Sequence, residues 1–397
     1  MSNSEESNVV DPMRSPWIGL DIGGANIKVA HTNGWSNHLD FPMWKQPTLL
    51  ASALGELLDE SPPFAGIGLT MTGELADCFQ TRAEGVATIL DQVTTILPAQ
   101  LVRVYSVNGT WLTVGAAARS PWTVAASNWV ALAKFMAVKF SEGRGLIVDI
   151  GSTTTDIIPI SNDEIAIDAK TDSQRMQCGA LVYTGVERSN VAAISRSVPL
   201  YGASCPLMNE LFATSRDVHL WLGDIEDNPT CNQTADGAPA TRAHARFRLA
   251  RVVGEDGSTL ADSDIDAIAN QIRLDQTTLI ARGMEKVVHA AWTKNSTTSK
   301  KSRASKTKDG VDRQSSGACL PDQILVSGHG DFLVEDAMRI LDWNMPRTNW
   351  SSCYSPELSR IGPAYAVAML GAIDSEAREC DSGSAKGLRQ EDGGMKI

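Results

Sequence analysis

The chain has 397 residues, of which 43% are hydrophobic and 21% charged, and its formal net charge is -12. This composition is typical of a globular protein that is long enough for two domains. The negative charge argues against nonspecific binding to nucleic acid or to an anionic membrane surface, because both carry charge of the same sign.

The amino-terminal sequence and the cysteine spacing bear on the cellular location of the protein. Residues 1–16 are polar and lack the basic and apolar regions of a secretory signal, so we expect a disordered tail. No apolar run approaches the roughly 20 residues that a membrane helix needs. The seven cysteines include no Cys-x-x-Cys pair, which indicates reduced thiols in place of a disulfide framework or a zinc site. We therefore expect a cytoplasmic protein.

The first structured stretch, residues 17–30, reads WIGLDIGGANIKVA. Its first apolar run ends in Asp21, a turn of small residues follows at Gly23 and Gly24, and a second apolar run contains Lys28. This pattern predicts a β-hairpin. Turn amides donate to phosphate oxygens, and a carboxylate at a strand end suits a divalent cation. Lys28 is a candidate counter-charge to a leaving phosphate, although a strand lysine is as often a solvated end.

Apolar spacing predicts the next elements as a helix over 49–58, a strand over 66–70, a helix over 85–93, a strand over 102–107 and a helix beginning near 128. Glu74 follows the 66–70 strand, and we expect it near the mouth of a binding cleft as a candidate general base. Asp77 and Glu187 compete for that role.

A second hairpin pattern occupies residues 146–159, with the sequence LIVDIGSTTTDIIP. Asp149 stands at its strand end, and the predicted phosphate-binding turn comprises Gly151, Ser152, Thr153, Thr154 and Thr155. Two like hairpins indicate a duplicated α/β domain. We expect a first domain over 17–142 and a second over 143–373. Asp21 and Asp149 are the candidate Mg²⁺ ligands, directly or through water.

Residues 178–254 show little regular periodicity and are too long for an ordinary connection, which indicates a substrate-specific insertion. This insertion contains a basic run, Arg242, Arg246, Arg248 and Arg251. Two interpretations of the run stay open. Either the arginines belong to the insertion's substrate-specific function, or they pair with acidic neighbours on a solvated surface.

The remaining chain begins with a long amphipathic helix predicted over 265–292. Residues 293–317 are rich in Ser, Thr and Lys, so we expect a disordered surface loop. A third motif, residues 324–331, predicts a strand that ends in Gly328, His329 and Gly330 before a helix, where backbone approaches a ligand closely. We expect a last helix over 364–373 and a mobile polar tail over 374–397.

Two histidines are candidates for proton transfer. His31 and His329 each stand at the end of a predicted strand. A lone histidine in that position is more often structural.

The three glycine-containing motifs, in this order, resemble those of the acetate and sugar kinase, heat-shock ATPase and actin superfamily. The resemblance implies an α/β protein of two ribonuclease H-like (actin-like ATPase) domains that face a central cleft. It further implies that the two hairpins are phosphate loops and that the third motif lies at the nucleoside site.

A narrower resemblance concerns the hydantoinase/oxoprolinase-like proteins, in the branch associated with tetrahydromethanopterin-linked one-carbon transfer. It rests on residues 69–77, 126–129, 148–159, 181–186 and 212–218, and it extends from about 17 to 373 without the basic loop. This resemblance implies a transferase of methanofuran or methylofuran biosynthesis. Such an enzyme joins an aminomethylfuran-methyl diphosphate to the phenol oxygen of a tyramine derivative and releases diphosphate.

The implied chemistry suits the predicted turns. Mg²⁺, Lys28 and the second turn would neutralise the leaving diphosphate, and Glu74 would take the phenol proton. The expected partners are small-molecule substrates, without nucleic acid or membrane, and the oligomeric state stays open. ATP is possible but not required. The alternatives are an ATP-dependent small-molecule kinase or oxoprolinase-type hydrolase, and a non-catalytic actin-like nucleotide-binding module.

Overall fold

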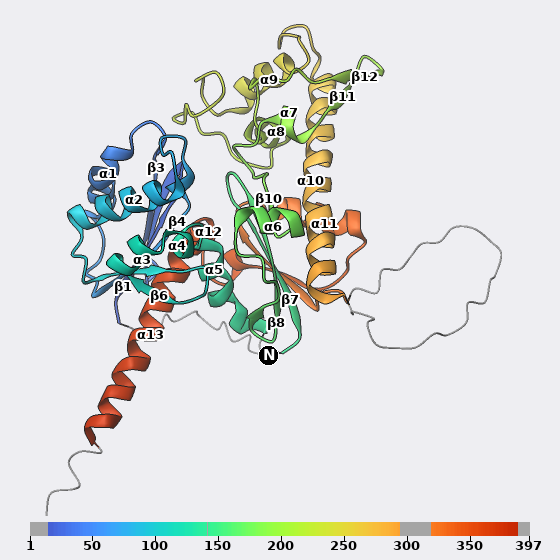
Figure 1. The fold of residues 1–397 in the computed structure, drawn as a ribbon. Helices are drawn as coiled ribbons and strands as arrows, with labels where there is room; N and C mark the ends of the chain where they lie inside the picture. Colours follow the sequence, from blue (N-terminus) through green and yellow to red (C-terminus); the bar gives the residue numbers. More distant parts are fainter. Residues whose placement is uncertain (1–14, 141, 294–318, 388–397) are drawn as a thin grey trace, which may run out of the picture. The chain divides into compact units, whose positions relative to one another are not determined.

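A computed structural model describes residues 15–140, 142–293 and 319–387. The predicted amino-terminal tail and basic loop lie outside these ranges, apart from Ser15, Pro16 and Thr293. The chain divides into two compact units (Figure 1). Unit 1 contains Met1–Lys139 and Asn349–Ile397, and unit 2 contains Phe140–Thr348.

Unit 1 is built on a six-stranded sheet in the order β3-β2-β1-β4-β5-β6. The strands are β1 (Trp17–Ile22), β2 (Asn26–His31), β3 (Ser36–Asp40), β4 (Gly66–Met71), β5 (Val102–Tyr105) and β6 (Trp111–Thr113). Strands β1, β2 and β3 form an antiparallel meander, and β4 and β5 continue from β1 in parallel. This order is that of a ribonuclease H-like domain, as predicted.

Helices cover both faces of this sheet. They are α1 (Leu50–Leu58), α2 (Arg82–Ile96), α3 (Val114–Arg119), α4 (Pro121–Val124), α5 (Asn128–Ala137), α12 (Pro356–Arg360) and α13 (Gly362–Gly387). Alternate residues of β1 join α1 and α2 in one apolar core. The residues between them, including Gly19, face α13, because a Cβ at Gly19 would lie 1.9 Å from the Ala364 carbonyl oxygen. Only glycine permits that approach of helix to strand.

Two predictions about the end of the chain are wrong. Residues from Asn349 onward belong to unit 1, although we had placed the second domain as far as residue 373. Residues 374–387 continue α13, although we had expected a mobile tail from 374. Long-range contacts that the sequence does not reveal extend the helix: Trp111 Nε1 donates to Asp374, and the Ser15 amide donates to Glu376.

The sheet of unit 2 has the same pairing of its first strands as the sheet of unit 1. Its sheet has the order β10-β8-β7-β13-β14, with β9 paired to β8. The strands are β7 (Arg144–Ile150), β8 (Thr155–Ser161), β9 (Glu164–Ile165), β10 (Leu181–Val182), β13 (Gln323–Gly328) and β14 (Arg347–Asn349). Strand β7 pairs antiparallel with β8 and parallel with β13, as β1 does with β2 and β4. The duplication of an α/β domain is therefore confirmed.

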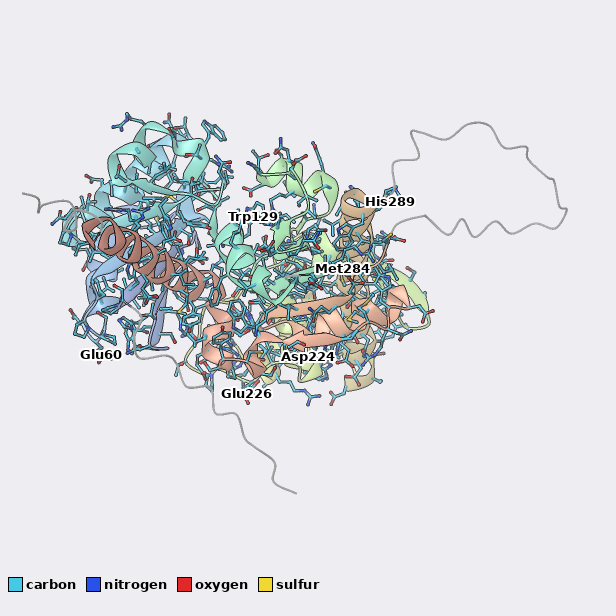
Figure 2. The ribbon with its side chains drawn as sticks, turned by 90° about the horizontal axis from the view of Figure 1, so that it is seen from below. Glu60, Trp129, Asp224, Glu226, Met284 and His289 are labelled. Atoms are coloured by element: carbon cyan, nitrogen blue, oxygen red, sulfur yellow. The ribbon has the colours of Figure 1, made fainter. Side chains whose placement is uncertain are left out.

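One face of the second sheet packs against two helices, α10 (Asp262–Trp292) and α11 (Asp331–Leu341). Met284 of α10 is buried in this core, whereas His289, five residues later, is exposed (Figure 2). The short helix α6 (Asp172–Cys178) joins β9 to β10. In the part of the chain described, no helix combines the length and apolarity needed to cross a membrane.

The predicted insertion has regular structure and its own core. Its elements are α7 (Val191–Ile194), β11 (Ser197–Leu200), β12 (Ala203–Pro206), α8 (Ser215–Leu222) and α9 (Arg242–Arg251). They pack on the amino-terminal half of α10, where Ile265, Ile268 and Ile272 complete an apolar cluster (Figure 1). Most of these elements are shorter than ten residues, and half of the ten residues of α9 are arginine or histidine, so no clear apolar period appears and the sequence indicated only an irregular region.

Candidate functional site

The carboxyl end of β1 carries a row of polar side chains. Asp21 is directly opposite Lys28 on β2 and beside Thr70 on β4. Lys28 Nζ lies 4.0 Å from Asp21 Oδ2, and Thr70 Oγ1 donates to Asp21 Oδ1 at 3.4 Å. Asp21 is 3% exposed. The predicted metal ligand and the predicted counter-charge are thus neighbours on one face of the first sheet.

The first turn, residues 23–25, is held by backbone hydrogen bonds on both flanks. The Gly23 amide donates to the Asn26 carbonyl oxygen at 2.9 Å, and the Met43 amide donates to the Gly24 carbonyl oxygen at 3.0 Å. The Gly23 amide is therefore used within the hairpin. Any phosphate contact of this turn must come from its remaining backbone groups.

Glu74 is buried, in contrast to its predicted place near a cleft mouth. It lies in the short 3₁₀ helix Gly73–Leu75, is 1% exposed, and has Arg82 Nε 3.6 Å from its Oε1. The absence of a Cβ on Gly85 lets α2 pack directly against the Glu74 backbone. Its burial and the facing arginine make Glu74 part of the local packing of unit 1. These contacts do not favour Glu74 as the general base.

His31 has a structural role, which is the more frequent one for a lone histidine at a strand end. It is 4% exposed, its Nε2 lies 3.2 Å from the Pro63 carbonyl oxygen, and its Nδ1 accepts from the Asn33 amide. Both ring nitrogens therefore have local backbone partners. Asp77, the other competitor in unit 1, is exposed.

In unit 2 the strand end carries two carboxylates. Asp149 on β7 is directly opposite Asp156 on β8, and like charges in that position repel each other. Arg175 of α6 relieves the repulsion, because its guanidinium forms a buried ion pair with Asp156. Asp149 is only half-buried. The predicted metal ligand therefore stands beside a carboxylate that the protein has neutralised.

The second turn, residues 151–154, is supported by the segment 184–188. The Val186 amide donates to the Gly151 carbonyl oxygen at 3.0 Å, and the Glu187 and Arg188 amides both donate to the Ser152 carbonyl oxygen at 2.9 Å. Gly185 is required here, because a Cβ would lie 2.5 Å from the Gly151 carbonyl oxygen. Sequence analysis missed this supporting role, although the resemblance over 181–186 marked part of the segment.

The residues of the second turn differ in what they offer to a ligand. Ser152, Thr153 and Thr154 are half-buried, so part of each residue reaches solvent. Thr155 is fully buried, and its hydroxyl donates to the Thr184 carbonyl oxygen at 2.8 Å. Thr155 thus supports the fold, which corrects its predicted place among the phosphate-binding residues.

The third glycine motif lies against the second turn. The His329 amide donates to the Ile150 carbonyl oxygen at 3.1 Å, and its ring Nε2 lies 3.4 Å from Glu187 Oε1. Glu187 also pairs with Arg216 of α8. Burial alone would raise the pKa of Glu187, but the hydrogen bond to His329 and the charge of Arg216 outweigh it and hold that pKa well below its usual range. Glu187 therefore stays ionised, which makes it a poor general base.

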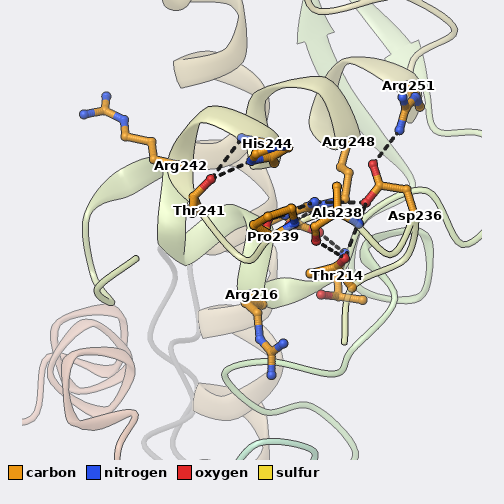
Figure 3. Close-up of polar contacts among 12 residues, drawn as sticks. Thr214, Arg216, Asp236, Ala238, Pro239, Thr241, Arg242, His244, Arg248 and Arg251 are labelled. Atoms are coloured by element: carbon orange, nitrogen blue, oxygen red, sulfur yellow. Dashed lines mark hydrogen bonds and ion pairs between the residues drawn. The ribbon is translucent and has the colours of Figure 1, made fainter. Parts of the chain in front are cut away.

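Three arginines of the basic run, Arg246, Arg248 and Arg251, pair with acidic residues, and Figure 3 shows Arg251 beside Asp236. Arg248 is fully buried, with Nε 2.6 Å from Asp217 Oδ1 and Nη1 3.0 Å from Asp236 Oδ1. Arg251 reaches the other oxygen of Asp236 at 2.9 Å. Arg246 pairs with Asp262, and the Arg242 guanidinium lies over the Trp221 ring. The predicted acidic pairing is confirmed for Arg246, Arg248 and Arg251, but the predicted solvated surface is wrong for Arg248, which is fully buried.

The donor set fits Mg²⁺ better than zinc. Within the described ranges, no group of three or more His, Cys, Asp and Glu side chains is arranged to hold a metal ion. Mg²⁺ keeps several waters and commonly binds through one or two carboxylates plus substrate phosphates. The carboxylates of Asp21 in unit 1 and of Asp149 in unit 2, each beside a turn at a strand end, are oxygen donors of the type that Mg²⁺ prefers.

Comparisons with known proteins assign the family. The sequence profile of the hydantoinase/oxoprolinase family matches residues 66–304, more than half of the chain. The chain belongs to this family. A relative from Methanocaldococcus jannaschii, named (4-{4-[2-(gamma-L-glutamylamino)ethyl]phenoxymethyl}furan-2-yl)methanamine synthase, is 33% identical over 357 residues, covering 89% of this hydantoinase/oxoprolinase family member and 96% of that protein. A Methanococcus vannielii relative of the same name is 30% identical over 229 residues, or 57% of this chain and 89% of its own.

Solved structures give a weaker likeness. An archaeal actin homologue matches with a TM-score of 0.41 at 13% identity, covering 90% of this chain and 99% of its own. The activator of the 2-hydroxyisocaproyl-CoA dehydratase from Clostridium difficile, with bound ADPNP, matches with a TM-score of 0.40 at 12% identity, covering 91% and 97%. The fold assignment therefore rests on the strand order described above.

Proposed function

We propose that this family member is a transferase of methanofuran-type cofactor biosynthesis. It would join an aminomethylfuran-methyl diphosphate to the phenol oxygen of a tyramine derivative and release diphosphate. The observation that carries the proposal is the 33% identity to a named synthase across 89% of this chain, a span that exceeds either unit alone. In unit 2 the half-buried second turn offers groups suited to a diphosphate, and in unit 1 the Asp21–Lys28 pair offers a carboxylate and a cation of the kinds that such a ligand and its metal need.

The reaction balances without a redox partner. The bond between the furanylmethyl carbon and the diphosphate oxygen breaks, and its electron pair leaves with the diphosphate. A bond then forms between that carbon and the phenol oxygen, which loses its proton. The furan ring oxygen stabilises positive charge on the carbon, so the barrier depends on how well the leaving diphosphate is neutralised.

Several residues of the chain would contribute to neutralising the diphosphate. Polar groups of residues 152–154 donate to diphosphate oxygens, and Lys28 offsets developing negative charge. Asp21 and Asp149 would hold Mg²⁺, which when bound supplies further charge neutralisation. ATP is not needed for this reaction.

We propose His329 as the group that takes the phenol proton. Its Nε2 faces the ionised Glu187 at 3.4 Å, which orients the ring and stabilises it once protonated. Both ring nitrogens are buried without a hydrogen-bond partner in the described part of the chain, so the ring has a nitrogen left to accept the phenol proton.

The test is a direct assay with a synthetic furanmethyl diphosphate and tyramine or γ-glutamyltyramine. The expected result is Mg²⁺-dependent release of diphosphate in equal amount to an aryl ether product detected by mass spectrometry. Substrate-dependent hydrolysis of ATP without an ether product would contradict the proposal and favour a kinase or an oxoprolinase-type hydrolase.

A thermal-shift comparison separates the ligand classes before any substrate is made. Stabilisation by Mg²⁺ with diphosphate, in excess of that by Mg²⁺ with ATP or ADP, is expected of the transferase. A preference for ATP would instead favour a nucleotide-using enzyme or an actin-like module.

A further inference from the structure

A chain of buried polar groups connects the insertion to the second turn. It begins at His219 of α8, which is fully buried. The ring Nδ1 lies 3.0 Å from Asp224 Oδ2, and Nε2 lies 3.0 Å from Gln276 Oε1 of α10. Asp224 comes just after α8 (Figure 2). The mechanism proposed above uses none of these residues.

The orientation of the Gln276 amide follows from its other partner. Gln276 Nε2 lies 2.8 Å from the Gly185 carbonyl oxygen and 3.0 Å from Thr184 Oγ1. A backbone carbonyl can only accept, so the amide nitrogen must face Gly185. The amide oxygen is therefore the atom that faces His219.

This orientation fixes the hydrogens on the histidine ring. Both ring nitrogens face oxygen acceptors, and a neutral imidazole carries hydrogen on only one of them. Only the doubly protonated ring donates to both Asp224 and Gln276. The hydrogen-bonding geometry therefore fits a ring that carries hydrogen on both nitrogens.

The surroundings balance that charge. Asp224 also accepts from Arg273 Nη1 at 2.8 Å, and Arg273 Nη2 reaches Asp336 of α11 at 2.8 Å. Phe332 of α11 packs against the ring at 4.9 Å between centroids. Two cations and two carboxylates thus alternate around an aromatic side chain, an arrangement that makes a buried imidazolium tolerable.

This series of buried polar groups ends at the second turn. Thr184 accepts the Thr155 hydroxyl through its carbonyl oxygen, and Gly185 packs on the Gly151 carbonyl oxygen. Gln276 holds these two residues of the 184–188 segment, and that segment holds the turn through the Val186 and Glu187 amides. A change at His219 therefore reaches the turn through one side chain.

We propose that doubly protonated His219 and Gln276 are positioning residues for the second turn, residues 151–154. The proposal rests on the proposed function in one respect, namely that this turn binds the diphosphate. The insertion would then set the geometry of the diphosphate site without touching the ligand.

The first test needs no ligand. In ¹⁵N-histidine NMR spectra at pH 7, assigned by comparison with His219→Gln, His219 is expected to show two protonated ring nitrogens. A singly protonated ring would overturn the assignment of the imidazolium.

The second test compares Gln276→Met with Gln271→Met, a matched control. Gln271 lies on another face of the same helix and donates to Asp275. Gln276→Met should accelerate hydrogen exchange of the Val186 and Glu187 amides by about tenfold or more, because the Gly185 carbonyl loses its donor, whereas the control should change it less than about twofold. Unchanged exchange in a folded Gln276→Met protein would overturn the positioning role.

The third test uses Mg²⁺ with inorganic diphosphate as the probe. Gln276→Met should weaken binding by about tenfold, and Gln276→Glu should do the same while keeping His219 doubly protonated, because its second oxygen faces the Gly185 carbonyl. Wild-type affinity in both folded variants would overturn the positioning of the diphosphate site. If the wild-type protein itself does not bind diphosphate, the exchange result still stands and only the proposed function fails.

Discussion

At the scale of single residues, the protein distinguishes two carboxylates that lie side by side. Asp149 and Asp156 are opposite each other on β7 and β8, and the buried Arg175 guanidinium pairs with Asp156. One carboxylate serves the fold, and the half-buried one stands beside the turn. We therefore expect substitution of Asp149 to affect turnover and substitution of Asp156 to affect stability.

Asp149→Asn should lower turnover by about 100-fold with little change in Tm, because it removes a negative charge proposed to hold Mg²⁺ at the diphosphate. Steady-state kinetics and thermal unfolding check both parts. The contrasting variant is Asp156→Asn, which removes the nearest counter-charge of the buried Arg175, leaves Asp172 at 4.0 Å, and should lower the stability by up to about 3–5 kcal/mol. Near-normal turnover in a folded Asp149→Asn enzyme would contradict the assigned role.

At the scale of elements, close packing and buried ion pairs decide where helices lie. Helix α13 runs antiparallel to β1, since Gly19 contacts its beginning near Ala364 and Trp17 contacts it at Gly371. It therefore begins toward the strand end that carries Asp21. In the insertion, α8 and α9 are joined by the internal Asp217–Arg248 pair, with Asp236 between Arg248 and Arg251.

Gly19→Ala should destabilise the protein by about 1–3 kcal/mol, because the new methyl group forces α13 away from the sheet. Chemical denaturation measures the change. Gly55→Ala is the matched control: Gly55 lies within α1, where a Cβ would meet nothing within 4 Å. That substitution should stabilise by about 0.5–1 kcal/mol, since alanine loses less entropy in a helix. Equal effects of the two variants would refute the packing argument.

The insertion should contribute to acid sensitivity. Burial raises the pKa of Asp236, but hydrogen bonds from the Ala238 amide, Arg251 and Arg248 outweigh it and lower this pKa from 3.8 to about 2. Between these values the unfolded chain binds more protons, so the contribution is present above pH 3.8 and is lost as the pH falls toward 2.

Urea unfolding at pH 5 and pH 2.5 tests this linkage. The wild type should lose about 1 kcal/mol more stability than Asp236→Asn over that interval, a value reduced for the partial solvent exposure of the carboxylate. Glu187 titrates in the same direction in both proteins, so it does not enter the difference. Identical acid profiles for the two proteins would show that Asp236 is not linked to folding.

At the scale of the whole molecule, the chain presents the same device twice. Each unit ends a buried strand in an aspartate, follows it with a small-residue turn, and pairs the strand with an antiparallel and a parallel neighbour. The proposed function assigns both devices to one substrate. That assignment predicts how substitutions of the two aspartates combine in their effect on kcat/KM.

If Asp21 and Asp149 act on the same metal-bound diphosphate, their substitutions should not be additive. Each single change to Asn should lower kcat/KM by about 100-fold, and the double variant should lose about 100- to 1,000-fold in place of about 10,000-fold. A full multiplicative loss in the double variant would indicate that the two carboxylates serve independent steps.

The sequence by itself determined the local parts of this protein. The two hairpins, the glycine motif of residues 328–330 and the long helix α10 were all predicted, because strand alternation, turn residues and helical period are properties of neighbouring residues. The ribonuclease H-like fold, in contrast, was predicted from the resemblance to a known superfamily, because local patterns do not reveal that β4 pairs with β1 and not with β3.

Only the tertiary structure decided which distant groups meet. The burial of Glu74, the pairing of Arg175 with Asp156, the place of α13 in unit 1, and the line from His219 through Gln276 to Gly185 join residues that are far apart in sequence or that face one another only after folding. Such contacts depend on which faces of the elements pack together. No local pattern encodes that choice, because it is the free energy of the whole packed core that selects it.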